Sequence, residues 1–301
     1  MSAMNEFFIQ KKVLVFGAGV IGSIYALKLS NAGHDVTLYA RGKRLQSLKS
    51  KGLLYNEKKE VKKARVKIAD TINAAERFDY VFVAVRYEQI DEALQELKQN
   101  DSPNIVTMVN NPKGYAEWEE VIGKGKLIPA FAGAGGTIED DILHYVFTPR
   151  IIQSTTFGEV GGTITGRLEA LAKVFKSCRI PYSISKNMDA WQKSHLALVV
   201  PLANGVYFAG GNTYALAKNK EALRTMGIAL KKNFAALKSK KTPITPPKLN
   251  AIRICPLWAM IILLKLFCRT KLAETLTGHV PYARNEMEVL NKELHALIKQ
   301  S

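Results

Sequence analysis

Three glycines near the start of the chain have a spacing that can hold a phosphate-bearing cofactor. Gly17, Gly19 and Gly22 form the pattern G-x-G-x-x-G directly after the short apolar run VLVF. In such a pattern the first glycine makes a tight turn, the second lets the backbone approach a pyrophosphate, and the third lets a helix lie close to its strand. Val20 and Ile21 should then open a helix whose free N–H groups face the phosphates. The spacing predicts a dinucleotide site, with a purely structural glycine turn as the alternative.

The end of the next predicted strand, DVTLY, indicates which dinucleotide binds. NAD-binding units place an acidic residue about 20 residues beyond the glycines, whereas this chain has Arg41, followed by Lys43 and Arg44. A guanidinium can pair bidentately with a 2′-phosphate, which NADH lacks. NADPH is therefore the favoured cofactor, and a solvated basic turn is the alternative. Arg86, at the end of a later predicted strand, could contact the adenosine phosphates or be an ordinary exposed turn residue.

Two further residues could take part in a reaction. Lys193 lies near the start of the apolar segment MDAWQKSHLALVVPLANGVYFAG, where an ionisable residue indicates either a pocket or a side chain that extends to solvent. Hydride addition to a ketone builds negative charge on the oxygen, which an ammonium group can stabilise and protonate. Asn111 follows a predicted strand and enters an Asn-Pro-Lys-Gly turn. Its amide could reach a substrate or the nicotinamide, or it could simply form the turn.

The sequence indicates two parts that would position these residues, an N-terminal sheet and a helical C-terminal domain. Strand and helix patterns alternate from Val13 to about Thr165, and helical periodicity dominates thereafter. The predicted fold class is α/β, with an N-terminal Rossmann-type, doubly wound parallel sheet and an all-helical C-terminal domain. The predicted domains are a cofactor domain over residues 1–165 and a substrate or dimerisation domain over residues 166–301.

Composition narrows the class of protein. The chain has 301 residues, of which 47% are hydrophobic and 23% charged, as in globular proteins. The N-terminal MSAMNEFFIQKK lacks a signal-peptide pattern, and Cys178, Cys255 and Cys268 lack metal-ligand or disulfide spacing. We therefore expect a cytoplasmic protein without a metal site.

The net charge of +17 raises the question of a polyanionic partner. The basic residues are concentrated in LKKNFAALKSKKTPITPPK, but no helix-turn-helix, zinc finger or RNP-like motif accompanies them. We expect no nucleic-acid partner. Most of these charges should be solvated, and a positive field would also attract a polyanionic cofactor and a carboxylate substrate.

One strongly apolar segment, Leu257 to Phe267, needs an explanation. It falls short of the ~20 residues needed to cross a bilayer, and Lys265 interrupts it. The expected arrangement is a helix buried between other helices or in a homodimer interface. Contact with a membrane surface is the less favoured alternative.

Taken together, the motifs resemble the ketopantoate reductase (2-dehydropantoate 2-reductase) family over essentially the whole chain. The resemblance rests on VLVFGAGVIGSIYALKLSNAGHDVTLYAR, VAVRYEQIDEAL, the NNPKG loop and AWQKSH. It implies that NADPH reduces the keto group of a branched 2-oxo acid, a small-molecule carboxylate. It also implies that Arg41 and Arg86 contact the 2′-phosphate region, that Asn111 lies near the nicotinamide and substrate, and that Lys193 is the catalytic lysine.

Departures from the family pattern cluster where the substrate would be recognised. Ala197 and Pro201 stand one and two turns after the lysine, where the family has asparagines, and LTGHVPYARNEMEVL shows no recognisable form of the family's acidic C-terminal motif. His195 or His279 could replace a lost polar contact, although either is more often a structural histidine. Two functions therefore remain open. One is a reductase of ketopantoate or another carbonyl compound, and the other is a non-catalytic NADPH sensor or scaffold that retains the fold.

Overall fold

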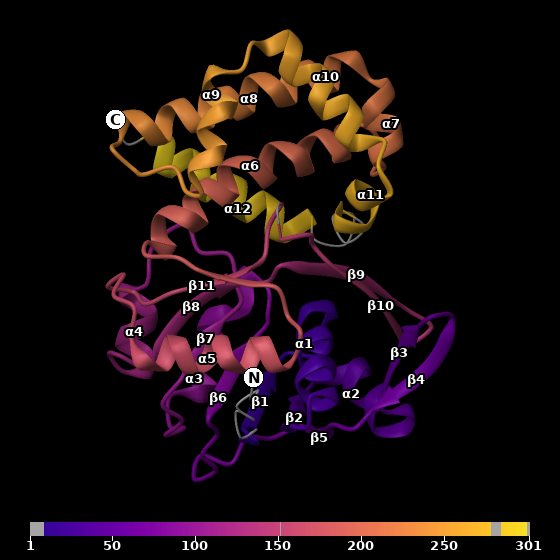
Figure 1. Cartoon of the computed structure of the whole chain (residues 1–301), viewed down its shortest axis with the longest axis vertical. Coiled ribbons are helices and arrows are strands. Elements are labelled where there is room, and N and C mark those ends of the chain that lie inside the picture. Colours follow the sequence, from indigo (N-terminus) through magenta and orange to yellow (C-terminus); the bar gives the residue numbers. More distant parts are fainter. Residues whose placement is uncertain (1–8, 151, 278–283, 300–301) are drawn as a thin grey trace, which may run out of the picture.

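An eight-stranded sheet forms the N-terminal part of the computed structural model, which describes residues 9–150, 152–277 and 284–299 (Figure 1). The strand order is β12-β11-β8-β7-β6-β1-β2-β5, and every neighbouring pair is parallel except β8 with β11. The order reverses beside β1, as in doubly wound sheets, which confirms the predicted fold class. The strands are β1 (Lys12–Phe16), β2 (Asp35–Tyr39), β5 (Lys67–Ala69), β6 (Tyr80–Val83), β7 (Ile105–Thr107), β8 (Leu127–Phe131), β11 (Thr155–Phe157) and β12 (Tyr182–Ile184).

Helices cover both faces of this sheet, which explains why its strands are continuous apolar runs. On one face, Phe82 packs with Tyr25 and Phe175 from two helices, at ring-centroid distances of 6.2 and 6.0 Å. On the other face, Val81 and Val83 belong to a second core cluster, which contains residues of three further helices. The helices of this part are α1 (Val20–Asn31), α2 (Gly42–Lys51), η1 (Tyr87–Gln89), α3 (Ile90–Leu97), α4 (Ala116–Ile122) and α5 (Gly166–Ser177).

A smaller sheet of four strands packs beside α1, within the part of the chain that the structure describes. Its order is β4-β3-β10-β9, with β3 parallel to β10 and the other neighbours antiparallel. The buried side chains of Leu53, Tyr55 and Leu143 join the same core as α1. The strands are β3 (Leu53–Glu57), β4 (Glu60–Ala64), β9 (Ala134–Glu139) and β10 (Ile142–Phe147).

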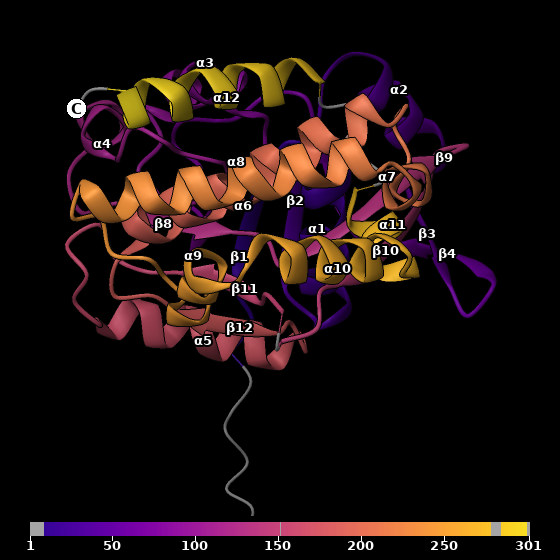
Figure 2. The same cartoon turned by 90° about the horizontal axis from the view of Figure 1, so that it is seen from above.

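The C-terminal part consists of helices, which Figure 2 shows from above. The long helix α6 packs against α8, and Pro201 lies inside α6 without ending it. Leu196, Val200, Leu230 and Phe234 form the centre of a separate core. The elements are α6 (Met188–Phe208), α7 (Thr213–Lys218), α8 (Lys220–Ser239), η2 (Pro247–Asn250), α9 (Ala251–Ile254), α10 (Leu257–Cys268), α11 (Lys271–Thr277) and α12 (Arg284–Lys299).

The change from sheet to helices occurs later than the sequence suggests. Strand β12, beyond Thr165, pairs in parallel with β11, and Leu168, Leu171 and Phe175 of α5 belong to the core of the sheet. The helical part thus begins at α6, so we propose a domain boundary between Ile184 and Met188.

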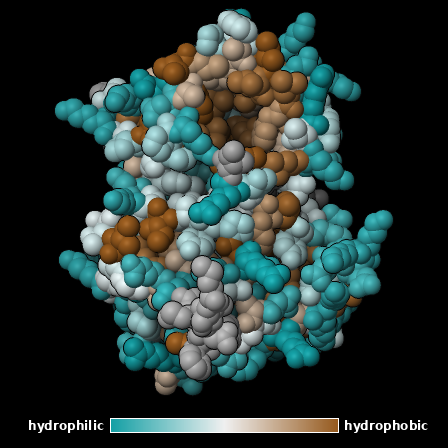
Figure 3. All heavy atoms as spheres, viewed as in Figure 1, coloured by the Kyte–Doolittle hydropathy of each residue, from teal (hydrophilic) through white to brown (hydrophobic). Residues whose placement is uncertain are grey.

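The segment Leu257–Phe267 forms the expected helix, but the other helices of the chain do not cover it, so of the two expected coverings only a homodimer interface is left as a prediction. Of the residues in α10, only Met260 and Cys268 are buried. Trp258, Ile262 and Leu266 are 69%, 50% and 56% exposed. Figure 3 shows hydrophobic residues gathered over the helical part of the molecule, around a hollow. None of the described helices combines the length and the apolar character needed to cross a bilayer.

Candidate functional site

The three glycines of the turn between β1 and α1 differ in what surrounds them. Gly17 has a φ of +107°, and a Cβ there would lie 2.5 Å from the carbonyl oxygen of Ala84. A Cβ on Gly22 would lie 1.8 Å from the carbonyl oxygen of Gly17, so the helix can approach the strand only with glycine at this position. A Cβ on Gly19 would meet nothing within 4 Å. The turn is therefore closed around Gly17 and Gly22 and open at Gly19.

This geometry fits the pyrophosphate of a dinucleotide. The open space lies at the N-terminus of α1, where Val20 and Ile21 occupy the first turn, and N–H groups there have no partner within the helix. The first turn contains no acidic side chain that would repel a phosphate. The glycine turn and the first turn of α1 thus have the geometry that the predicted dinucleotide site requires.

Arg41 follows β2 and is already surrounded by polar partners. Its Nε donates to the Tyr39 hydroxyl at 2.8 Å, and its two terminal nitrogens pair with Glu92, at 2.5 Å, and with Glu96. The guanidinium carbon lies 5.5 Å from the centroid of the Tyr39 ring. The hydrogen bonds to Tyr39 and Glu92 raise the pKa of Arg41, so it stays charged. The structure thus places a fixed cation at the end of β2, beside two carboxylates.

Arg44 belongs to the basic cluster that the sequence places after β2, and the structure adds its contact with the glycine turn. Its Nε donates to the carbonyl oxygen of Ala18, inside the glycine turn, at 3.2 Å. Both terminal nitrogens are buried without a hydrogen-bond partner among the described residues, although Nη1 lies 3.7 Å from Asp141. Burial lowers the pKa of Arg44. An incompletely satisfied guanidinium beside the turn is suited to a phosphate ligand.

Arg86 precedes η1 at the end of β6, the strand next to β1, and its side chain is exposed. The carbonyl oxygen of Ala84, two residues earlier, is the atom that faces Gly17. Arg86 therefore lies at the same carboxyl edge of the sheet as Gly17 and Arg41, where the sequence predicts the adenosine end of the cofactor.

Asn111 holds its own loop together. Its Oδ1 accepts hydrogen bonds from the backbone N–H groups of Lys113 and Gly114, at 2.9 and 3.1 Å. Its Nδ2 donates to the carbonyl oxygen of Gly114 at 2.6 Å, and the residue is 1% exposed. Gln192 of α6 accepts a hydrogen bond from the backbone N–H of Asn111. Of the two uses that the sequence left open for this amide, turn formation is the one that the structure contains.

Lys193 lies in the second turn of α6 and forms an ion pair within the helix. Its Nζ is 2.7 Å from Oδ2 of Asp189, one turn earlier, and its side chain is 17% exposed. The other oxygen, Oδ1 of Asp189, is buried without a hydrogen-bond partner among the described residues and faces Gly114. The next residue toward the N-terminus, Gln192, donates to the carbonyl oxygens of Val109 and Ala130. These bonds fix the start of α6 over the carboxyl ends of β7 and β8, so Lys193 and Asn111 belong to adjoining parts of one region.

Glu286 of α12 is a carboxylate that sequence reasoning missed. Its Oε1 accepts from the backbone N–H of Tyr87 at 3.4 Å and from Nδ2 of Asn110 at 3.3 Å. Burial, with a smaller contribution from Glu88, raises the pKa of Glu286 above the ordinary glutamate value. A signal was available in the sequence, because Glu286 and Glu293 lie seven residues apart and so share one face of the last amphipathic helix.

The histidine alternatives have different outcomes. His195 is buried, stacks on Trp191 at a centroid distance of 5.1 Å and contacts Phe131 at 4.1 Å. Burial lowers the pKa of His195 to about 3, so it is neutral near pH 7 and cannot act there as a proton donor of ordinary strength. His279 lies outside the described residues.

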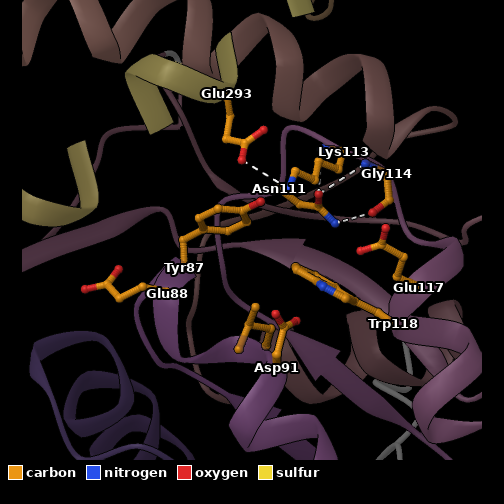
Figure 4. A pocket seen from close by; sticks show the side chains of 10 residues that line it. Tyr87, Glu88, Asp91, Asn111, Lys113, Gly114, Glu117, Trp118 and Glu293 are labelled. Atoms are coloured by element: carbon orange, nitrogen blue, oxygen red, sulfur yellow. Dashed lines mark hydrogen bonds and ion pairs between the residues drawn. The ribbon is translucent and has the colours of Figure 1, made fainter. Parts of the chain in front are cut away.

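A cavity of about 150 Å³ lies next to this region, between α3, α4 and α12 (Figure 4). Its lining includes Asn111, Lys113 and Glu293, and the last two form an ion pair of 3.1 Å. Four carboxylates line the cavity, so it is a poor site for phosphates. Lys193 and the glycines of the turn do not line it. The cavity therefore does not represent the cofactor site.

The fold and the glycine turn define a protein class: a Rossmann-type dinucleotide-binding sheet joined to a helical part. The family model described as "Ketopantoate reductase PanE/ApbA" matches residues 13–170, just over half of the chain. This chain belongs to that family.

Individual comparisons agree with the assignment. A 2-dehydropantoate 2-reductase from Archaeoglobus fulgidus is 30% identical over 168 residues, which are 55% of this chain and 53% of that protein. The match thus spans about half of the relative's length. A PanE/ApbA family ketopantoate reductase from Ralstonia eutropha superposes with a TM-score of 0.66 and 16% identity, covering 96% of this chain and 99% of that one. D-mandelate dehydrogenase, solved with NADH and anilino(oxo)acetate, gives a TM-score of 0.68 and 16% identity, covering 95% and 98%.

Proposed function

We propose that this protein is an NADPH-dependent oxidoreductase that reduces the keto group of a 2-oxo acid, with 2-dehydropantoate or a related carbonyl compound as its substrate. The observation that carries the proposal is the pairing of two features at one edge of the sheet. One is the glycine turn that is open only at Gly19, and the other is the Lys193–Asp189 pair fixed over the neighbouring strand ends. The family and the fold shared with an NADH-bound dehydrogenase of a 2-hydroxy acid support a nicotinamide cofactor.

The preference for NADPH is argued from charge. Arg41, Lys43 and Arg44 supply three positive charges after β2, and Arg86 supplies a fourth from the end of β6. Glu92 and Glu96 offset part of this charge, but they also hold the Arg41 guanidinium in one orientation. A 2′-phosphate, which NADH lacks, would be attracted by this cluster of positive charge and could form charge-assisted hydrogen bonds with it.

Each residue of the substrate region has a role in this proposal. The nicotinamide, when bound, supplies the hydride. The ammonium group of Lys193 would hydrogen-bond the carbonyl oxygen, stabilise the charge that builds there and donate the proton. Asp189 would orient this ammonium group through the ion pair within α6. Asn111 would hold its loop in the observed conformation. Glu286, beside Asn110, would be an anion when ionised and a hydrogen-bond donor when protonated.

A second function has specific support. The amide of Asn111 is used within its own turn, Lys193 is paired with Asp189, and Ala197 and Pro201 stand where family members carry asparagines. These features suit a protein that binds NADPH and senses its level without reducing a substrate.

Steady-state oxidation of NADPH in the presence of a panel of 2-oxo acids separates the two functions. The reductase proposal expects turnover of at least one branched 2-oxo acid. Binding of NADPH in a fluorescence titration, combined with no turnover of any member of the panel, would replace the reductase by the sensor. Absence of dinucleotide binding would reject both.

A further inference from the structure

The feature that the proposed function does not use is the outer side of α10. Ile254, the last residue of α9, and Trp258, Ile262, Leu263 and Leu266 of α10 are between 50% and 79% exposed, and we call this set the α10 face. Trp258, Ile262 and Leu266 follow one another at intervals of four residues, so they form a stripe along one side of the helix. Figure 1 shows α10 at the outer end of the helical part, away from the large sheet.

The α10 face is held rigidly, because the opposite side of the helix packs closely on α8. A Cβ on Gly227 of α8 would lie 2.9 Å from Cδ1 of Leu257, and Met260 is 5% exposed at this contact. Lys231 of α8 donates to the carbonyl oxygens of Arg253 and Cys255, at 2.8 and 2.7 Å, and so fixes the turn before α10. The apolar stripe is therefore exposed while the opposite side of α10 is packed against α8.

The segment of the chain that contains the stripe is strongly basic. From Lys218 to Lys271 the chain contains thirteen lysines and arginines and a single carboxylate, Glu221. Lys265 belongs to α10, Arg269 follows it directly, and Arg253 belongs to α9, the short helix before it. Ile228, on the neighbouring helix α8, is also 46% exposed. The region therefore combines exposed aliphatic and aromatic side chains with a dense positive charge.

This combination distinguishes two possible occupants. A second copy of the chain in a twofold-symmetric contact would bring the same basic surfaces together, and like charges oppose such a contact. An anionic lipid surface would accept the apolar side chains in its interface and attract the surrounding cations. Tryptophan is also a favoured residue at the boundary between headgroups and acyl chains.

We propose that the α10 face binds the surface of an anionic lipid bilayer, with α10 lying in the plane of the interface and without any segment crossing the membrane. The basic residues between Lys218 and Lys271 would supply long-range attraction to the headgroups. The apolar stripe would supply the insertion that makes binding persist when salt is raised moderately. This inference is independent of the proposed reductase or sensor function.

Sedimentation of the full chain with lipid vesicles tests the proposal. Vesicles of phosphatidylcholine with about one third phosphatidylserine should bind the protein, and vesicles of phosphatidylcholine alone should bind it much more weakly, because each basic residue near an anionic surface contributes to attraction. Tryptophan emission gives a second readout, because Trp258 is 69% exposed, whereas Trp118 and Trp191 are buried. Binding should therefore shift the emission to shorter wavelength.

Ile262→Glu is the decisive variant, since it keeps Trp258 as a reporter and removes one buried contact from the bound state. We expect a fall of at least about tenfold in the vesicle partition coefficient. The matched control is Val61→Glu on β4, a side chain that is 52% exposed in the small sheet, and its partition coefficient should equal that of the parent. Thermal unfolding by circular dichroism verifies that both variants remain folded.

Several results would overturn the proposal. These are equal binding to charged and uncharged vesicles, an unchanged partition coefficient for Ile262→Glu in folded protein, and no binding to either vesicle. If light scattering without lipid instead finds a dimer that Ile262→Glu dissociates, while vesicles bind no protein, the α10 face is an interface between copies of this chain.

Discussion

The large sheet and the helical part differ in how their functional features are built. In the sheet, the turn at Gly17, Gly19 and Gly22 depends on backbone geometry, because the absence of a Cβ determines what can approach. In the helical part, Glu286 acquires partners only through folding, since Tyr87 and Asn110 lie 199 and 176 positions away. The spacing of the three glycines is therefore local to the sequence, whereas the partners of Glu286, and those of Arg41 at the end of β2, come from tertiary packing.

The first and largest expected effect concerns the substrate side of this comparison. Lys193→Met keeps much of the apolar stem and removes the charge. If the ammonium group acts in the transition state, kcat should fall by about 10²–10⁴-fold while NADPH affinity stays nearly unchanged. Steady-state kinetics and a fluorescence titration measure the two quantities. Near-normal turnover by the methionine variant would show that the stem, rather than the charge, matters.

Two alanine variants sharpen the account of the cofactor side. Gly22→Ala places a methyl group against the carbonyl oxygen of Gly17, and we expect a loss of roughly 3 kcal/mol in the free energy of unfolding. Gly19→Ala meets no protein atom, so stability should be kept or rise by about 0.4–1 kcal/mol. Its methyl group would nevertheless occupy the space for the pyrophosphate, so dinucleotide affinity should fall.

Urea unfolding and cofactor titration of both glycine variants provide the measurement. If Gly19→Ala bound NADPH as tightly as the parent, the open side of the turn could not be the pyrophosphate site.

Arg41→Ala tests whether the basic cluster selects the cofactor. Charge-assisted hydrogen bonds are worth roughly 1.5–3 kcal/mol, so affinity for NADPH should fall about tenfold to a hundredfold while affinity for NADH changes little. Lys98→Ala, at the exposed end of α3, is a control that should affect neither cofactor. Equal affinities for NADPH and NADH in the unmodified protein would refute the selection.

The smallest effect is a change in how stability depends on pH. Because the pKa of Glu286 is raised in the folded state, the folded chain holds this proton at pH values where the unfolded chain has lost it. Stability should therefore fall as the pH rises from the ordinary glutamate pKa through the raised one. Glu286→Gln keeps an acceptor for Tyr87 and Asn110 and should remove this part of the slope. Urea titrations at a series of pH values detect it, and identical slopes would contradict the assignment.

The sequence predicts the local parts of the structure well. The runs VLVF and DYVFVAV appear as the neighbouring strands β1 and β6, and the G-x-G-x-x-G turn lies between strand and helix as expected. Each of these features depends on apolar periodicity or on glycine, which act over a few residues. The predicted family and fold class are confirmed for the same reason.

Features that depend on distant partners were not predictable in the same way. Strand β12 has three residues and is recognised only by its pairing with β11. The hydrogen bonds that Asn111 makes within its loop depend on the folded position of Lys113 and Gly114, so the sequence alone did not reveal them. For α10, the apolar composition does not specify whether other parts of the chain cover the helix. In the structure they leave the α10 face exposed. The positions of Arg44 and Glu286 likewise depend on which elements pack against them.

Transfer of the hydride is the step that most directly tests whether this chain is an enzyme. NADPH deuterated at the transferable position of its nicotinamide ring would be incubated with 2-dehydropantoate and related 2-oxo acids, and the products analysed by mass spectrometry. The account predicts a 2-hydroxy acid that carries one deuterium on its former keto carbon, formed by the parent protein and much more slowly by Lys193→Met. A parent protein that binds NADPH but transfers no deuterium to any of these acids would contradict it.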